Sequence, residues 1–470
     1  MKHYGDHVED LKITYVGGGS RAWAWKFMSD LATMGDVSGS VDLYDIDLQA
    51  AKNNAVIGNK FNDAEGANTT WKYRAVETID EALEGADFVI ISILPATFDE
   101  MESDVHWPEK YGTYQTVGDT TGPGGIVRAM RTLPMYEYIA GKIREHCPDA
   151  WVISYTNPMA LCVKQLYDTF PGIKAYGCCH EVFNTQNFLV EVAEDAFGVS
   201  GLTRDDIKIN PVGVNHYTWF TEAHYKDHDL FPVYKDFCEK HPDGYRSRRQ
   251  IAANKSFETD YFASDELVKM TLFLRFGYIA AAGDRHLAEF CPAGWFLEND
   301  DRVKEMHFAR TPVSYRKKDL EDRLARSAAL VSGQEEVKIG ETGEEGTRQI
   351  RAILGLSDLV TNVNLPNRGQ IANLPFGAVV ETNAVFRAGT VTPVLAGPIP
   401  ETISPMIERV CHEEELIFEG IKERDVNKIF AAFVNDPLIT CGYEDAKKMF
   451  REMCENTKAY LKMYDLDALK

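Results

Sequence analysis

The chain has 470 residues, more than one small hydrophobic core can organise, so we expect two domains. Its 50 basic and 72 acidic side chains give a net charge of −22, which would repel a phosphate backbone and excludes nucleic acid as a partner. No apolar run is long enough to cross a bilayer, no signal-peptide segment is visible, and nine cysteines lack a disulfide-type spacing. We therefore expect no membrane partner and a cytoplasmic protein.

Short β-type and helical segments alternate through the first part of the chain. This alternation predicts parallel strands joined by right-handed helical crossovers, with ligands beyond the carboxyl ends of the strands. We predict an α/β fold with a Rossmann-type parallel sheet over residues 1–200. The β-type runs are residues 13–16, 41–44, 86–93, 151–154 and 173–176, and the main helical patterns are 22–34, 50–61 and 158–167.

The pattern loosens beyond residue 200, where we predict a second, mixed α/β domain over residues 201–470. Residues 225–255 indicate loops with short helices, and residues 403–461 are helical in pattern. Residues 334–348 are polar and contain five glutamates, which favours a solvated loop. Two further β-type runs cover residues 378–381 and 390–392.

A glycine-rich loop follows the first predicted strand. Gly17, Gly18 and Gly19 let the backbone turn sharply and approach a pyrophosphate, and Ser20 leads into the next helix. Asp45 ends the second strand and could accept hydrogen bonds from a ribose 2′-hydroxyl, which disfavours NADP. The loop lacks the third glycine of the full motif, but its position predicts NAD binding.

Residues 116–131 hold four glycines and a proline just before a helical pattern. A structural turn explains one or two glycines, whereas four suggest backbone packed against a ligand, with Arg128 and Arg131 available to an anion. Asn157 stands at the end of a later strand, where it either caps the following helix or binds substrate hydroxyls.

Two polar clusters suggest a metal. Cys179 and His216 both leave β-type segments, and a thiolate with an imidazole ordinarily favours zinc or iron over manganese, although spacing does not settle the metal. Further on, Asp284, Arg285 and His286 precede Glu289 by about one turn. This charged group is either a site of proton transfer or a solvated turn.

Seven ordered segments together resemble the family 4 glycoside hydrolases, which are NAD- and metal-dependent. The resemblance covers nearly the whole chain. The segments are GGGS (17–20), WPEKYGTYQTVGDTTGPGG (107–125), TNP (156–158), CHEV (179–182), GVNH (213–216), GDRHLAEF (283–290) and NLP (373–375).

This resemblance implies a lactate/malate dehydrogenase-like Rossmann domain joined to a mixed α/β domain that carries catalysis and oligomerisation. It also implies NAD and Mn²⁺ as cofactors. Family members oxidise the sugar at C3 by hydride transfer to NAD, which acidifies the C2 proton. A base removes that proton, the aglycone is eliminated, water adds and the hydride returns, so no net NADH accumulates. The metal polarises the sugar oxygens as a Lewis acid.

The resemblance also implies residue roles. Cys179 and His216 would be the metal ligands. Asp284 matches the C2 base best, with Tyr261 a second candidate, and His180 would protonate the leaving group.

Glu181 carries the expected substrate preference. Phospho-sugar members carry Cys-Asp at this place and neutral α-glycosidase members Cys-His-Ser, whereas CHEV-type members are associated with uronic acids. The implied substrates are α-galacturonides, then α-glucuronides, with neutral α-galactosides or α-glucosides as alternatives. Because Glu181 would repel a substrate carboxylate, we expect it to pair with an arginine or bind a sugar hydroxyl, while Arg128 or Arg285 binds the carboxylate and Asn157 contacts the sugar.

Two other classes of function remain open. An NAD-dependent dehydrogenase of the malate or lactate type would share the sheet, but it would not need the metal pair. A catalytically inert sugar- or nucleotide-sensing protein would not need all seven segments. The oligomeric state that we expect is a homodimer or homotetramer.

Overall fold

The computed structural model describes residues 1–340 and 342–469, and its larger sheet has ten strands. Six strands pair in parallel in the order β7-β6-β5-β2-β3-β4. Strand order reverses between β2 and β5, so their carboxyl ends border the crevice where ligands bind in doubly wound sheets. The strands are β2 (Val8–Val16), β3 (Val37–Tyr44), β4 (Trp71–Ala75), β5 (Phe88–Ile91), β6 (Trp151–Ser154) and β7 (Lys174–Gly177), with β1 (Lys2–His3) paired to β2.

Helices cover both faces of this sheet, as the apolar strands require. One face packs on a core that includes Phe27 and Met28 of α1, and the other on a core that includes Ile139 of α5 and Leu166 of α6. The predicted alternation is confirmed by α1 (Trp23–Ala32), α2 (Leu48–Lys60), α3 (Ile79–Leu83), α4 (Phe98–His106), α5 (Gly122–His146) and α6 (Met159–Thr169).

Three strands from the second half of the chain complete the same sheet. They are β12 (Leu359–Pro366), β13 (Val379–Arg387) and β14 (Thr390–Pro393), all antiparallel to their neighbours. Strand β12 joins the edge strand β7 where Asn364 faces Gly177. The sheet therefore crosses residue 200, and the expected division of the chain there stays a prediction.

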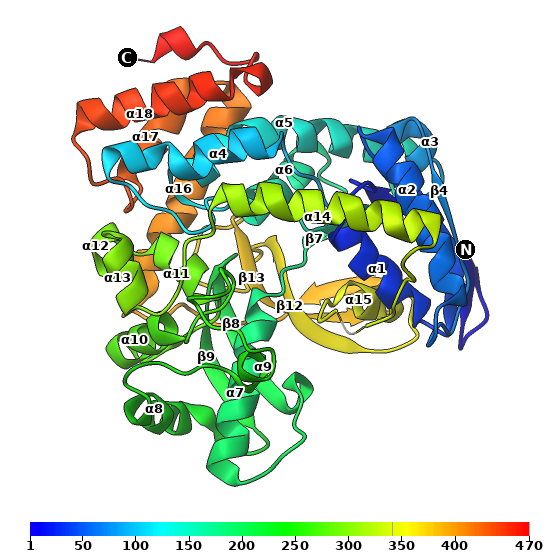
Figure 1. Ribbon diagram of the computed structural model, residues 1–470, viewed down its shortest axis with the longest axis horizontal. Coiled ribbons are helices and arrows are strands. Elements are labelled where there is room, and N and C mark those ends of the chain that lie inside the picture. Colours follow the sequence, from blue (N-terminus) through cyan, green and yellow to red (C-terminus); the bar gives the residue numbers. More distant parts are fainter. Residues whose placement is uncertain (341, 470) are drawn as a thin grey trace.

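The chain also forms a second, antiparallel sheet, whose strands β8 and β9 are labelled in Figure 1. It contains β8 (Ile207–Val214), β9 (Tyr217–Tyr225), β10 (His228–Asp229) and β11 (Ile279–Ala280). The mixed α/β fold class is thus confirmed. Helices of this part are α7 (Glu181–Phe197), α8 (Leu230–Lys240), α9 (Arg248–Ala252), α10 (Leu267–Phe276), α11 (Asp284–Phe290), α12 (Ala293–Phe296) and α13 (Asp300–Glu305).

The remaining helices join the two parts. Helix α14 (Val313–Ser332) packs against α2 and α4, and α15 (Gly346–Ile353) packs on α1. Helices α16 (Ser404–Glu423), α17 (Val426–Asn435) and α18 (Tyr443–Asn456) pack on α5 and bury a core of their own. None of the helices in the described residues combines the length and apolar character needed to span a bilayer.

The predicted solvated loop at residues 334–348 is confirmed over residues 334–340, which form no helix or strand and are exposed or half-buried. Gly340 donates its amide to Ser29 Oγ (3.1 Å), and the Thr342 hydroxyl donates to Asp30 Oδ2 (2.6 Å) on α1. The prediction is wrong at its end, because Glu345 is fully buried against arginines and residues 346–348 begin α15. Glu341, which belonged to that prediction, lies outside the described residues.

The contact between Asp30 and this segment predicts a pH effect on stability. Burial raises the pKa of Asp30 to about 7, and Glu344 adds to that rise while Thr342 and Lys26 oppose it. An unfolded aspartate titrates near about pH 4, so the stability that Asp30 contributes is present below that pH and lost as pH rises through about 7. The thermal midpoint of the wild type should therefore fall between about pH 5 and pH 8. In Asp30→Asn this fall should be smaller by about 2 °C.

Asp149→Asn, whose carboxylate is 99% exposed, serves as the matched control for this measurement. A wild-type slope in Asp30→Asn, or an equal change in the control, would show that Asp30 does not cause the effect.

Candidate functional site

The glycine-rich loop between β2 and α1 has the backbone geometry that the sequence predicts. Gly17 has φ of 93°, a left-handed value that favours glycine. A Cβ on Gly18 would lie 2.9 Å from the Cα of Leu43, so the close approach of two backbones also requires glycine. Asn54 Nδ2 donates to the carbonyls of Gly18 (2.8 Å) and Ser20 (2.9 Å) and fixes the loop from behind.

Asp45 completes this loop from the end of β3. Its Oδ2 accepts the amide of Gly19 (2.8 Å) and its Oδ1 the amide of Asp47 (2.9 Å), while burial raises its pKa. Ser20 Oγ accepts the amide of Trp23 (3.2 Å) at the start of α1. An acid at the second strand end, a tight glycine turn and a helix N-terminus fit a dinucleotide. The structure thus brings the predicted NAD-binding residues together.

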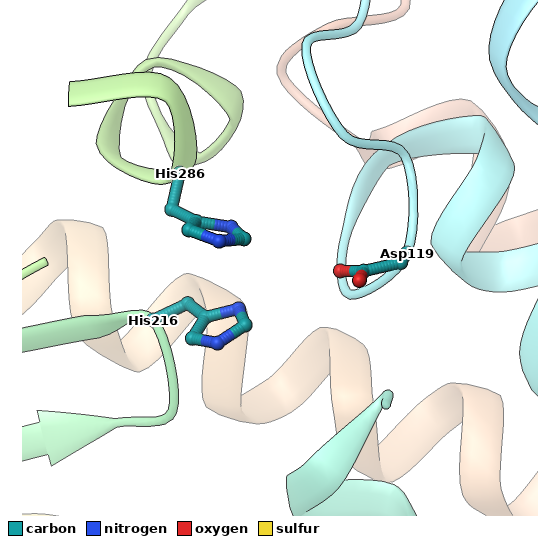
Figure 2. Close-up of side chains that lie close together, drawn as sticks. All are labelled: Asp119, His216 and His286. Carbon is teal, nitrogen blue, oxygen red and sulfur yellow. The ribbon is translucent and has the colours of Figure 1, made fainter. Parts of the chain in front are cut away.

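Three side chains from distant segments converge in a second place. Ligand atoms of Asp119, His216 and His286 all lie within 4.8 Å of one another (Figure 2). His216 occupies the turn between β8 and β9, His286 comes from α11, and Asp119 from the loop before α5. Figure 2 shows the two imidazoles beside each other, 3.9 Å apart at their centroids, with the Asp119 carboxylate facing them. We call these three residues the metal cluster.

The protonation states of the metal cluster suit a divalent ion. Burial and the neighbouring His286 lower the pKa of His216 to about 3, so its imidazole is neutral. Burial would raise the pKa of Asp119, but His286 and Arg128 outweigh it and hold this pKa well below its usual range. The Thr120 hydroxyl donates to Asp119 (2.7 Å) and lies 2.9 Å from His216 Nδ1, which leaves Nε2 with a free lone pair. The neutral imidazole of His216 and the ionised carboxylate of Asp119 are in the forms that bind Mn²⁺.

Cys179 does not join the metal cluster, although His216 does. The thiol is 5% exposed and packs among apolar side chains. Burial raises its pKa well above the usual range, and the carboxylates of Glu381 and Glu181 add to this rise. Its role as a metal ligand therefore stays a prediction.

Sequence reasoning missed two members of the metal cluster. Asp119 lies inside the glycine-rich segment 116–131, in which only the arginines were predicted to bind a ligand. His286 lies in the charged group at residues 284–286, in which Asp284 was the predicted base and Arg285 a predicted substrate residue. The signal that could have found both was a carboxylate or imidazole within each segment already singled out.

Glu289 holds the loop that presents Asp119. The amides of residues 116–118 donate to its Oε1 at 2.7, 2.8 and 2.9 Å. Because Glu289 and His286 lie three residues apart on α11, one short helix fixes both the imidazole and the loop opposite it.

The four glycines of segment 116–131 are explained within the protein, Gly118 by its left-handed φ of 63° and the other three by close contacts. A Cβ on Gly122, Gly124 or Gly125 would clash with neighbouring atoms of the chain, 2.8 Å or less away. Arg131 is buried in an ion pair with Asp104 and is not available to a ligand.

Arg128 and Asn157 lie beside the metal cluster. Arg128 Nε donates to the Asn157 carbonyl (3.1 Å), and Asn157 Nδ2 donates to Asp119 Oδ2 (3.2 Å). The Asn157 side chain therefore contacts Asp119 of the metal cluster. The alternative, that it caps α6, is not observed, because α6 has no side-chain cap. The structure brings this predicted substrate residue to the cluster.

Several buried polar atoms around the cluster have no hydrogen-bond partner in the described part of the chain. They include Asn157 Oδ1, both polar side-chain atoms of Asn215, His286 Nδ1 and Glu289 Oε2. Buried polar groups are normally hydrogen-bonded, so their gathering here fits a place that receives a ligand.

Glu181 does not pair with an arginine as expected. Its Oε2 accepts the amide of Gly283 (2.7 Å), and its Oε1 lies 3.6 Å from His180 Nε2 and 3.9 Å from His286 Nε2. Burial would raise its pKa, but the imidazoles of His286 and His180 lower it to about 2. The carboxylate is thus stabilised by a backbone amide and two imidazoles.

Arg285 and Tyr261 meet at the rim of the site. Arg285 donates to the Tyr261 carbonyl (2.9 Å) and to the Thr311 hydroxyl, and its guanidinium lies 4.8 Å from the centroid of the Phe262 ring. The Tyr261 side chain is 39% exposed.

The Asp284 carboxylate binds the start of α10 and is not part of the metal cluster. It is fully buried, and its oxygens accept the amides of Val268 (3.1 Å) and Lys269 (3.1 Å) in the first turn of that helix. This geometry gives Asp284 a helix-capping role. Its assignment as the C2 base stays a prediction.

The metal cluster predicts which substitutions weaken Mn²⁺ binding. His286→Ala or Asp119→Ala should lower the affinity at least about tenfold, because each removes a ligand atom. Isothermal titration of the NAD-loaded enzyme with Mn²⁺ measures this, with His228→Ala, whose side chain is 52% exposed, as the control. If His286→Ala binds Mn²⁺ with wild-type affinity, His286 is not a metal ligand. Cys179→Ser tests the earlier prediction, since an equal loss would make Cys179 a ligand.

Comparison with known proteins reveals relatives along the whole chain. A family model described as family 4 glycosyl hydrolase matches residues 12–194, and one for the C-terminal domain of that family matches residues 211–439. The alpha-galacturonidase of Thermoanaerobacterium saccharolyticum is 54% identical over 468 residues, 100% of both chains. That of Bacillus subtilis is 44% identical over 449 residues, 95% of this chain and 98% of its own.

Solved structures agree. A Bacillus subtilis protein described as a glucosidase is 43% identical, covers 95% of this chain and 100% of its own, and has a TM-score of 0.90. A 6-phospho-alpha-glucosidase from gut microorganisms, solved with NAD and Mn²⁺, is 21% identical, covers 96% and 99% and has a TM-score of 0.77, which shows a shared fold. The resemblance drawn from the seven segments is confirmed, and this chain belongs to the family 4 glycosyl hydrolases.

Proposed function

We propose that this enzyme hydrolyses α-linked galacturonides, with NAD and Mn²⁺ as cofactors. The observation that carries the proposal is near full-length similarity, at 54% and 44% identity, to relatives named alpha-galacturonidase. Glu181 of the CHEV segment, whose side chain is 14% exposed, supports it, because this residue distinguishes the chain from phospho-sugar and neutral-sugar members.

The two cofactors divide the chemistry. The loop of Gly17, Gly18, Gly19 and Ser20, with Asp45, would hold NAD, which would supply a reversible hydride acceptor for the sugar C3. The metal cluster would hold a divalent ion, which would supply a Lewis acid for the sugar oxygens. With the hydride returned in each turnover, the net reaction would be hydrolysis.

The chain's own residues orient the sugar. Asn157 Nδ2 donates a hydrogen bond to Asp119, while Oδ1 is buried without a partner and is free to accept a hydrogen bond from a sugar hydroxyl. Glu181, fixed by Gly283 and flanked by His180, is positioned to accept a second hydroxyl. These contacts support a sugar in the space beside the metal cluster.

A substrate panel tests the reaction. With NAD, Mn²⁺ and a thiol reductant, kcat/KM for p-nitrophenyl α-galacturonide should exceed that for the α-glucuronide, α-galactoside and α-glucoside at least tenfold, about 1.4 kcal/mol in transition-state binding. NADH absorbance should not grow with turnover. A dehydrogenase of the malate type would instead accumulate NADH in proportion to substrate consumed, and a preference for the neutral glycosides would overturn the uronide assignment.

We propose His180 for protonation of the leaving group and Tyr261 for removal of the C2 proton. His180 lies between two carboxylates, 3.6 Å from Glu181 and 3.8 Å from Glu344, and its side chain is 36% exposed. Tyr261 is preferred to Asp284 because its side chain is exposed at the rim, whereas both oxygens of Asp284 accept amides of α10.

Deuterium incorporation at C2 during turnover in D₂O distinguishes the two candidate bases. Tyr261→Phe should lower kcat and the rate of deuterium incorporation at C2 together, by about 10²-fold or more. Asp284→Asn should keep incorporation and lower the thermal midpoint, since one helix cap is weakened. The opposite pattern would return the base role to Asp284.

We further propose a homodimer or homotetramer in the cytoplasm. Exposed apolar side chains such as Phe376 and Leu395, 82% and 80% exposed, support an interface between copies. All nine cysteines are free thiols, which supports a reducing compartment.

A further inference from the structure

Arg316 is a cation without a counter-charge in direct contact. It lies in the first turn of α14, and its Nε is buried without a hydrogen-bond partner. Within the described residues, it forms no ion pair with any carboxylate. A buried guanidinium normally pairs with an anion, because taking the charge out of water costs several kcal/mol by itself.

A second arginine lies close to it. Arg285 is held by the Tyr261 carbonyl and by Thr311, which stands five residues before Arg316 in the chain. Tyr315, the neighbour of Arg316, packs on Tyr261 with ring centroids 5.2 Å apart. Arg285 and Arg316 thus border the same contact, that of Tyr261 with residues 311–315, and their like charges lie within electrostatic range of one another.

Three carboxylates, those of Asp119, Glu289 and Asp319, lie within electrostatic range of Arg316. Asp119 accepts from Thr120 and Asn157, and Asp319 pairs with Arg323. One oxygen of Glu289 accepts three amides, and the other has no hydrogen-bond partner. Within the described residues, none of the three lies within 4.0 Å of a guanidinium nitrogen of Arg316.

The position of Arg316 on its helix adds to the cost. The N-terminal turn of a helix carries a partial positive charge and favours acids, yet α14 has no acidic residue in its first turn. An arginine placed there beside another arginine, with its Nε buried and without a hydrogen-bond partner, would be stabilised by an anion from outside the chain.

We propose that Arg316, together with Arg285, binds the carboxylate of the uronic acid substrate. The inference rests on the proposed function and names the residue that selects an anionic sugar. Two guanidinium groups can each donate paired hydrogen bonds to a carboxylate, which a neutral CH₂OH group cannot match. It also resolves the difficulty raised by Glu181, because the anion binds at the arginines rather than at that carboxylate.

The test compares one charged and one neutral substrate on Arg316→Gln. With NAD and Mn²⁺, kcat/KM for p-nitrophenyl α-galacturonide should fall about 100-fold, mainly through KM, while kcat/KM for the α-galactoside stays within about threefold of wild type. Calorimetric affinity for galacturonate should fall by a similar factor, and that for galactose should not. Arg316→Lys, which keeps the charge but not the fork, should fall in between.

A matched control lies on the same helix. Arg326→Gln removes an arginine that pairs with Glu335 at 2.8 Å and is 52% exposed, and it should leave both substrates unaffected. The thermal midpoint of each variant checks that it is folded.

Three results would overturn the inference. They are galacturonide kinetics within about threefold of wild type in Arg316→Gln, an equal loss on both substrates, or a loss of NAD affinity in place of galacturonate affinity. Failure of the proposed function is a different result, because the wild-type enzyme itself would then not prefer the galacturonide. The galacturonate affinities would still report whether Arg316 binds a carboxylate.

Discussion

Glu289 joins the two sides of the site through one carboxylate oxygen that accepts three consecutive amides, those of residues 116–118. Each of those amides would otherwise be a buried unsatisfied donor, at a cost of about 1–3 kcal/mol. The same short helix carries His286 and Arg285. The distance between Asp119 and His286, the orientation of Arg285 and the path of the chain into α5 therefore all depend on this interaction, in a loop that has no regular structure of its own.

Charge is arranged in the site so that each buried ion has a defined counterpart, present or supplied. Glu181 has a backbone amide and two imidazoles, and Asp119 has neighbouring cations. The arginines at the rim have no such counterpart within the described residues. A chain with an overall charge of −22 thus leaves Arg285 and Arg316 without an ion pair in the described residues, where an acidic sugar would supply the anion.

The parts of the molecule that sequence could predict are those fixed by local patterns. Apolar runs and helical periodicity located five of the six parallel strands and missed only β4, and the glycine turn with Asp45 located the dinucleotide loop, because neighbours in the chain determine both. The metal cluster brings together Asp119, His216 and His286, and their proximity depends on tertiary packing. Residues 284–286 show the difficulty, since consecutive side chains on a helix point about 100° apart and the sequence does not reveal which one faces the cluster. The return of residues 359–393 to the first sheet was likewise invisible, because antiparallel pairing over such a separation has no local signature.

That returning hairpin has a consequence for how the protein is made. Strand β7 would be the edge of the nucleotide-binding sheet until β12 is synthesised, more than 180 residues later, judging from Gly177 and Leu359. During translation, the emerging chain must keep this unpaired edge from joining another nascent chain, which is the usual route to aggregation for an exposed strand. The short length of β7, four residues, limits that hazard. A fragment ended at residue 200 would retain the nucleotide loop but not the strands that close its sheet.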